Sequence, residues 1–95
     1  MSRMSVEVMH RPELSRFEAC PQGELALCSY RLSGRTLVIH HTEVPPALQG
    51  QGVAADLVRA ALDWARQQGF QVQPRCSYVA AYMRRHPQTH DLLAG

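Results

Sequence analysis

The chain has 95 residues, an apolar fraction of 45% and a formal net charge of +2. Residues 1–95 therefore suffice for one domain with one modest core and leave no room for a second domain. The small charge argues against nucleic acid as the main partner, although all ten basic residues are arginines, and no apolar run approaches the roughly 18 residues that a membrane span needs.

The first half of the sequence predicts an antiparallel meander. Strands are expected at residues 6–9, 16–19, 24–32 and 35–44. Phe17 should point inward, Pro21-Gln22-Gly23 is a turn signal, and Ser33-Gly34 fits a tight hairpin turn. Residues 36–44 are rich in β-branched side chains, and Pro45 and Pro46 end that strand because proline cannot donate to a ladder.

The second half predicts a helix, a strand and a last helix. Residues 52–68 carry an apolar stripe on one side, with Asp56 among the polar residues expected on the other. Gly69 is typical of a helix end. A strand at residues 70–76 would then run parallel to the strand before the helix. Ser77 is expected to cap a helix from Tyr78 to Arg85, ended by Pro87.

The turn between the strand and the long helix is a candidate anion site. Gly50 and Gly52 bracket the first turn of the helix, where backbone N–H groups and the helix dipole favour a phosphate or diphosphate. A glycine pair also occurs in ordinary tight turns, so this pattern leaves both interpretations open. It fits neither the three-glycine dinucleotide fingerprint nor a P-loop.

Four short motifs carry a resemblance to a known family. They are His41-Thr42-Glu43-Val44-Pro45, Gln49-Gly50-Gln51-Gly52-Val53-Ala54, Pro74-Arg75-Cys76-Ser77-Tyr78-Val79, and Tyr82 with His86-Pro87. The second has the form Gln-x-x-Gly-x-Ala. Together they resemble a subgroup of the GCN5-related N-acetyltransferase (GNAT) superfamily whose members are about one hundred residues long.

The resemblance implies an α/β fold: a GNAT-like mixed sheet in which an antiparallel meander is followed by a β-α-β crossover and a C-terminal helix. It also implies an acetyl-CoA cleft between two splayed parallel strands. Thr42, Glu43 and Val44 would bond the pantetheine arm as an added strand does. Gln49, Gly50, Gln51, Gly52, Val53 and Ala54 would hold the diphosphate. The chain lacks the early helix pair that helps larger members bind the acceptor, and Val38 stands where many carry a glutamate base.

Cys76 and Tyr82 are the first candidates for chemistry. A cysteine before a helix should have a lowered pKa, and Cys76 could take the acetyl group as a thioester, or it could simply fill a strand end. In many family members a tyrosine on this helix protonates the leaving thiolate. Tyr82 stands at the matching place, with Tyr78 one turn earlier, and both could instead be core or rim aromatics.

His41 is the third catalytic candidate. His40 and His41 should occupy opposite strand faces, and His41 shares a face with Glu43, so this pair could deprotonate an amine. Solvated polar surface is the competing interpretation. His86 is expected to cap its helix. Arg84 and Arg85 could reach a phosphate of CoA, although solvated surface is the default interpretation of both.

The sequence thus predicts an N-acetyltransferase that moves an acetyl group from acetyl-CoA to an unidentified amine of a small molecule or protein. The alternative is a CoA-binding sensor or partner module without catalysis. Cys20, Cys28 and Cys76 are odd in number and lack metal-ligand spacing. We therefore expect no metal site and, without a signal peptide, a reducing cytoplasm.

Overall fold

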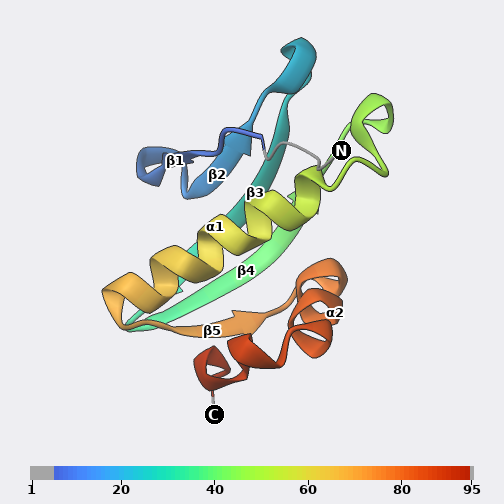
Figure 1. The fold of residues 1–95 in the computed structure, drawn as a ribbon. Helices are drawn as coiled ribbons and strands as arrows, with labels where there is room; N and C mark the ends of the chain where they lie inside the picture. Colours follow the sequence, from blue (N-terminus) through green and yellow to red (C-terminus); the bar gives the residue numbers. More distant parts are fainter. Residues whose placement is uncertain (1–5, 95) are drawn as a thin grey trace.

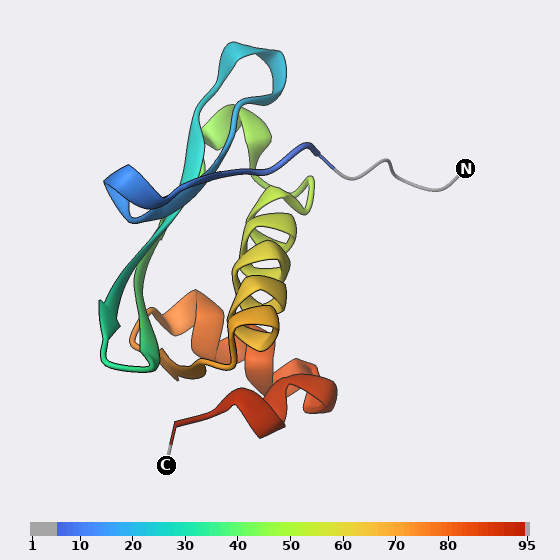
Figure 2. The same cartoon turned by 90° about the vertical axis from the view of Figure 1, so that its left-hand side faces the viewer.

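One mixed sheet organises the chain, with strand order β1-β2-β3-β4-β5 and helix α1 against one face (Figures 1 and 2). The computed structural model describes residues 6–94. The strands are β1 Met9–Arg11, β2 Arg16–Ala19, β3 Ala26–Ser33, β4 Thr36–Glu43 and β5 Gln71–Pro74, and the helices are α1 Val53–Gln68 and α2 Ser77–Arg85. Short 3-10 turns span Pro12–Leu14, Pro21–Gly23, Pro46–Leu48 and Pro87–Leu92.

The pairing confirms the predicted topology. β1 to β4 pair antiparallel in sequence order, and β5 joins β4 in parallel after the α1 crossover. No helix in residues 6–94 is both long enough and apolar enough to cross a membrane.

The first strand lies later than expected, at Met9–Arg11 rather than at residues 6–9. The backbone N–H of Val6 donates a hydrogen bond to the carboxylate of Asp56, with a donor–acceptor distance of 3.1 Å. This contact ties the segment before β1 to α1. The periodicity of Val6 and Val8 was therefore a poor guide to the strand.

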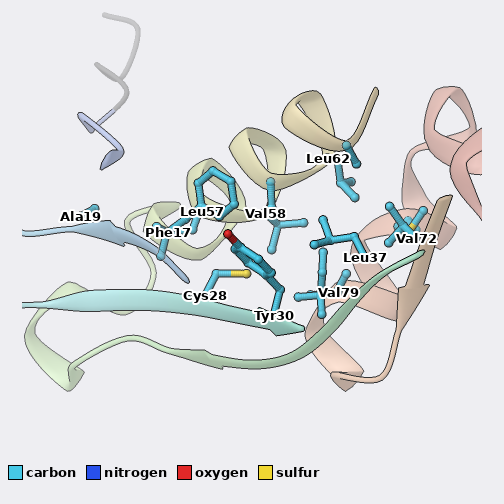
Figure 3. Close-up of a cluster of buried hydrophobic side chains, with 14 of the residues drawn as sticks. Phe17, Ala19, Cys28, Tyr30, Leu37, Leu57, Val58, Leu62, Val72 and Val79 are labelled. Carbon is cyan, nitrogen blue, oxygen red and sulfur yellow. The ribbon is translucent and has the colours of Figure 1, made fainter. Parts of the chain in front are cut away.

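Helix α1 matches its predicted span, with glycines of positive φ as caps, Gly52 at +79° and Gly69 at +74°. Its buried stripe faces the sheet, and Figure 3 shows Leu57 and Val58 above Cys28 and Tyr30 of β3. Asp56 was expected on the solvent side, which is wrong, because it is 4% exposed. Its carboxylate accepts from the Val6 amide and from Arg59 at 2.6 Å, so burial does not leave the charge without a partner.

β4 and β5 separate before β4 ends. Their ladder stops at Ile39 opposite Pro74, whereas β4 continues to Glu43. The N–H groups of Arg75 and Cys76 both converge on the carbonyl of Ile39, at 2.9 and 3.1 Å. The prediction that β5 reaches Cys76 is therefore too long, because the chain turns there into α2.

The C-terminal half of α1 covers a cluster of aromatic and histidine rings. His10 stacks on Phe17 with centroids 4.1 Å apart, and its Nε2 lies 2.6 Å from the hydroxyl of Tyr30. Trp64 packs edge-on against His10 and Phe70. Burial lowers the pKa of His10, and the nearby Glu13 opposes that shift.

Candidate functional site

A cavity of about 450 Å³ opens where β4 and β5 separate. The end of β4, the glycine turn and the start of each helix surround it. Its lining consists of Thr42, Val44, Leu48, Gln49, Gly50, Gly52, Val53, Ala54 and Tyr78. All but Leu48 and Tyr78 belong to the set predicted for cofactor binding, so the structure brings most of that set around one space.

An irregularity in β4 decides which side chains face this cavity. Ser29 pairs with His41 but Tyr30 pairs with Ile39, so His40 is an extra residue in the ladder, as in a β-bulge. Beyond it, Thr42 pairs with buried Cys28 and therefore lies on the inner face of the sheet.

His41 and Glu43 consequently lie on the outer face of β4. Their predicted proximity is present, with His41 Nε2 3.8 Å from Glu43 Oε1, and both side chains are more than half exposed. Neither belongs to the cavity lining described above. The residues at the end of β4 that were predicted for the site thus lie on both faces of the sheet. Thr42 and Val44 lie on the inner face, and His41 and Glu43 lie on the outer face.

The glycine turn presents the start of α1 to the cavity. Gly50 and Gly52 both have positive φ, at +82° and +79°, and within residues 6–94 no side-chain hydrogen bond caps the start of the helix. The first N–H groups of a helix, here Val53 and Ala54, have no intrahelical acceptor, and the helix dipole adds positive potential. This end of the cavity therefore suits a phosphate group.

The two glutamines of the turn hold it in place. Gln49 Nε2 donates to the carbonyl of Val44 at 3.2 Å, and Gln51 Nε2 donates to the carbonyl of Ala47 at 3.1 Å. Their backbone N–H groups donate to Pro46 and Leu48, each at 3.3 Å. These groups are thus engaged within the turn, and the anion site depends most on the amides that begin α1.

Cys76 is the N-cap of α2, the position that the sequence assigned to Ser77, and it contacts Thr42 of the cavity lining. Its Sγ is 3.5 Å from Oγ1 of Thr42. Partial burial alone would raise the pKa of the thiol. The Thr42 hydroxyl and the backbone N–H groups of Val79 and Tyr78 outweigh burial and lower the pKa below that of an ordinary cysteine. The predicted direction of this pKa shift is confirmed.

The two tyrosines of α2 have different surroundings. Tyr78 lines the cavity, whereas Tyr82 stacks on His86 with ring centroids 4.1 Å apart. Burial raises the pKa of both hydroxyls, which keeps them protonated at neutral pH. The sequence ranked Tyr82 above Tyr78, but Tyr78 is the tyrosine that reaches this space. Its position as the second residue of α2, two residues after Cys76, was the available signal.

Comparison with known proteins adds independent information. The family model for GCN5-related N-acetyltransferases matches residues 16–92. Protein NATD1 of Xenopus tropicalis is 30% identical over 86 residues, which cover 87% of this chain and 79% of that protein. Protein NATD1 of Mus musculus is 31% identical over 85 residues, with coverages of 86% and 77%.

The fold also has a solved counterpart. A solution structure of a GCN5-like protein from Staphylococcus aureus aligns with a TM-score of 0.75 at 24% sequence identity. The alignment covers 96% of this chain and 90% of that one. The five-stranded sheet with its crossover helix is therefore shared almost throughout.

Proposed function

This chain belongs to the GCN5-related N-acetyltransferase family and is an acetyltransferase, and from that premise we propose that acetyl-CoA is its donor and an amine its acceptor. The observation that carries the proposal is a cavity bordered by an anion-binding helix start, with a thiol of lowered pKa in contact with Thr42 of the cavity lining. A coenzyme A thioester has a diphosphate and a reactive acyl group joined by a long arm, which matches these two features.

The diphosphate would accept hydrogen bonds from the amides that begin α1. Gly50 leaves the approach clear, since even an added Cβ there would meet no atom within 4 Å. The arm would lie along Thr42–Val44, where β4 has run past the end of its ladder with β5. A peptide-like arm can bond such a strand edge as another strand would.

We propose Cys76 as the nucleophile. Its thiolate would attack the acetyl carbonyl carbon, a bond from Cys76 Sγ to that carbon would form, and the bond to the coenzyme sulfur would break. Tyr78, protonated at neutral pH, would give its proton to the departing thiolate and regain one from solvent. The amine would then attack the Cys76 thioester and release the thiol.

The amine would approach from the outer face of the sheet. His41 and Glu43 stand there on the same stretch of β4 that borders the cavity, and the 3.8 Å between His41 Nε2 and Glu43 Oε1 supports their use as a paired base. One of them would accept the proton that the amine loses. The three cysteines are free thiols, and we propose a reducing compartment such as the cytoplasm as the place of action.

Intact-protein mass spectrometry after exposure to acetyl-CoA tests this scheme. We expect one added acetyl group that hydroxylamine removes and that is missing from Cys76→Ser, together with release of free coenzyme A when amines are supplied. Acetyl transfer without any protein adduct, and undiminished in Cys76→Ser, would favour direct attack by the amine. Binding of coenzyme A without transfer to any amine would instead favour the sensor function.

A further inference from the structure

A second hollow lies beside the cavity, between the first turn of α1 and the exposed side of α2. Its volume is about 300 Å³. The lining consists of Ala55, Tyr78, Ala81, Tyr82, Arg85 and His86. Tyr78 also lines the main cavity, and Ala55 directly follows Ala54 at the helix start. We call this second hollow the α2 groove. Ala55 of its lining is one residue after Ala54, whose N–H is expected to bind the diphosphate.

The α2 groove combines a flat aromatic surface with a cation. The rings of Tyr82 and His86 lie 4.1 Å apart at an angle of 27°, and two alanines leave space beside them. Among residues 6–94 the ion pairs engage Arg11, Arg16, Arg59 and Arg66. Arg85 takes part in none of these ion pairs, so its guanidinium can receive a phosphate.

We propose that the α2 groove binds the adenosine 3′-phosphate end of the donor. The base would stack on the Tyr82–His86 pair, and Arg85 would form a bidentate contact with the 3′-phosphate. The inference rests on acetyl-CoA being the donor, because the diphosphate at the start of α1 then directs the nucleoside toward Ala55. Tyr82 is on this basis a binding residue, and the hydroxyl that serves the leaving thiolate is that of Tyr78.

Titration calorimetry with coenzyme A and with dephospho-coenzyme A, which lacks only the 3′-phosphate, tests the contact with Arg85. We expect the unaltered protein to bind coenzyme A about tenfold more tightly, as for one charge-assisted contact. Arg85→Ala should remove this preference. The matched control is Arg84→Ala, because Arg84 is an exposed arginine of the same helix outside the groove, and it should keep the preference.

Tyr82→Ala tests the aromatic surface separately. Its affinity for both ligands should fall about tenfold, and Tyr82→Phe, which keeps a ring, should lose much less. Equal affinity of the unaltered protein for the two ligands, or a preference that survives Arg85→Ala, would overturn the groove assignment alone. Failure of the unaltered protein to bind either ligand would overturn the donor assignment as well.

Discussion

Helix α1 separates two regions of very different construction. Trp64, near its C-terminal end, packs against rings from β1, β2 and β3 and against Phe70, and these rings fill the space between helix and sheet. The first turn of α1 borders an open cavity, whose lining includes Gly50, Gly52 and Ala54 beside larger side chains. The space beside the later turns is filled by rings, whereas the space beside the first turn is open, and this contrast predicts that stability and binding can be changed separately.

The largest effect is expected from the filled region. Phe17 is 3% exposed and contacts His10, Tyr30 and Trp64. Phe17→Ala should lower the free energy of unfolding by about 3–5 kcal/mol, through lost burial and the remaining void. Urea denaturation measures this loss. The folded variant should still bind coenzyme A. A loss of affinity under conditions where Phe17→Ala is still folded would show that stability and binding are not separate.

The next effect belongs to chemistry at the hollow end. Cys76→Ser should reduce acetyl transfer at least about a hundredfold while coenzyme A still binds. Because the pKa of Cys76 is lowered, iodoacetamide should modify it at neutral pH. Cys28 should stay unmodified in the folded protein, since burial raises the pKa of its thiol to about 12.

Cys20→Ser is the matched control for this substitution, because Cys20 is an exposed free thiol away from the cavity. It should transfer at the unaltered rate. A Cys76→Ser variant as active as this control would remove Cys76 from the mechanism.

A change of charge at the start of α1 sharpens the contrast further. Ala54→Glu places a carboxylate in the first helical turn, which should stabilise the helix slightly by about 0.3–1 kcal/mol. The same carboxylate would repel a diphosphate, and we expect about a tenfold loss of affinity for coenzyme A. Ala54→Gln has the same size without the charge and serves as the control. Similar affinities for the two variants would place the diphosphate elsewhere.

The smallest effect concerns pH and returns to the filled region. Because burial lowers the pKa of His10, the folded state binds a proton there less readily than the unfolded chain does. Its contribution to stability is complete above the unfolded pKa of about 6.5 and is lost as pH falls through the folded pKa. His10→Phe should flatten this part of the dependence of Tm on pH. An unchanged slope would show that other groups cause it.

The sequence predicted the strand order, the long helix and the glycine turn because each has a local signal. Period-two alternation, the apolar stripe of α1 and the capping positions of Gly52 and Gly69 are readable without partners. The sequence could not predict which face Thr42 occupies, because that depends on the extra residue at His40 in pairing with a distant strand. Asp56 was misplaced for a similar reason, since its partner Val6 is fifty residues away.

The extra residue at His40 also bears on how related sequences should be aligned. Side chains alternate along a regular strand, yet Ile39 and Thr42 are three residues apart and lie on the same face, because they pair with Tyr30 and Cys28 on either side of the extra residue. Removing His40 would keep both pairings and leave a regular ladder, so Thr42 and Val44 would still face the space that we assign to an anionic donor. Deletion of the His40 codon is therefore expected to preserve acetyl transfer. Homologues are best aligned there by strand pairing rather than by counting residues.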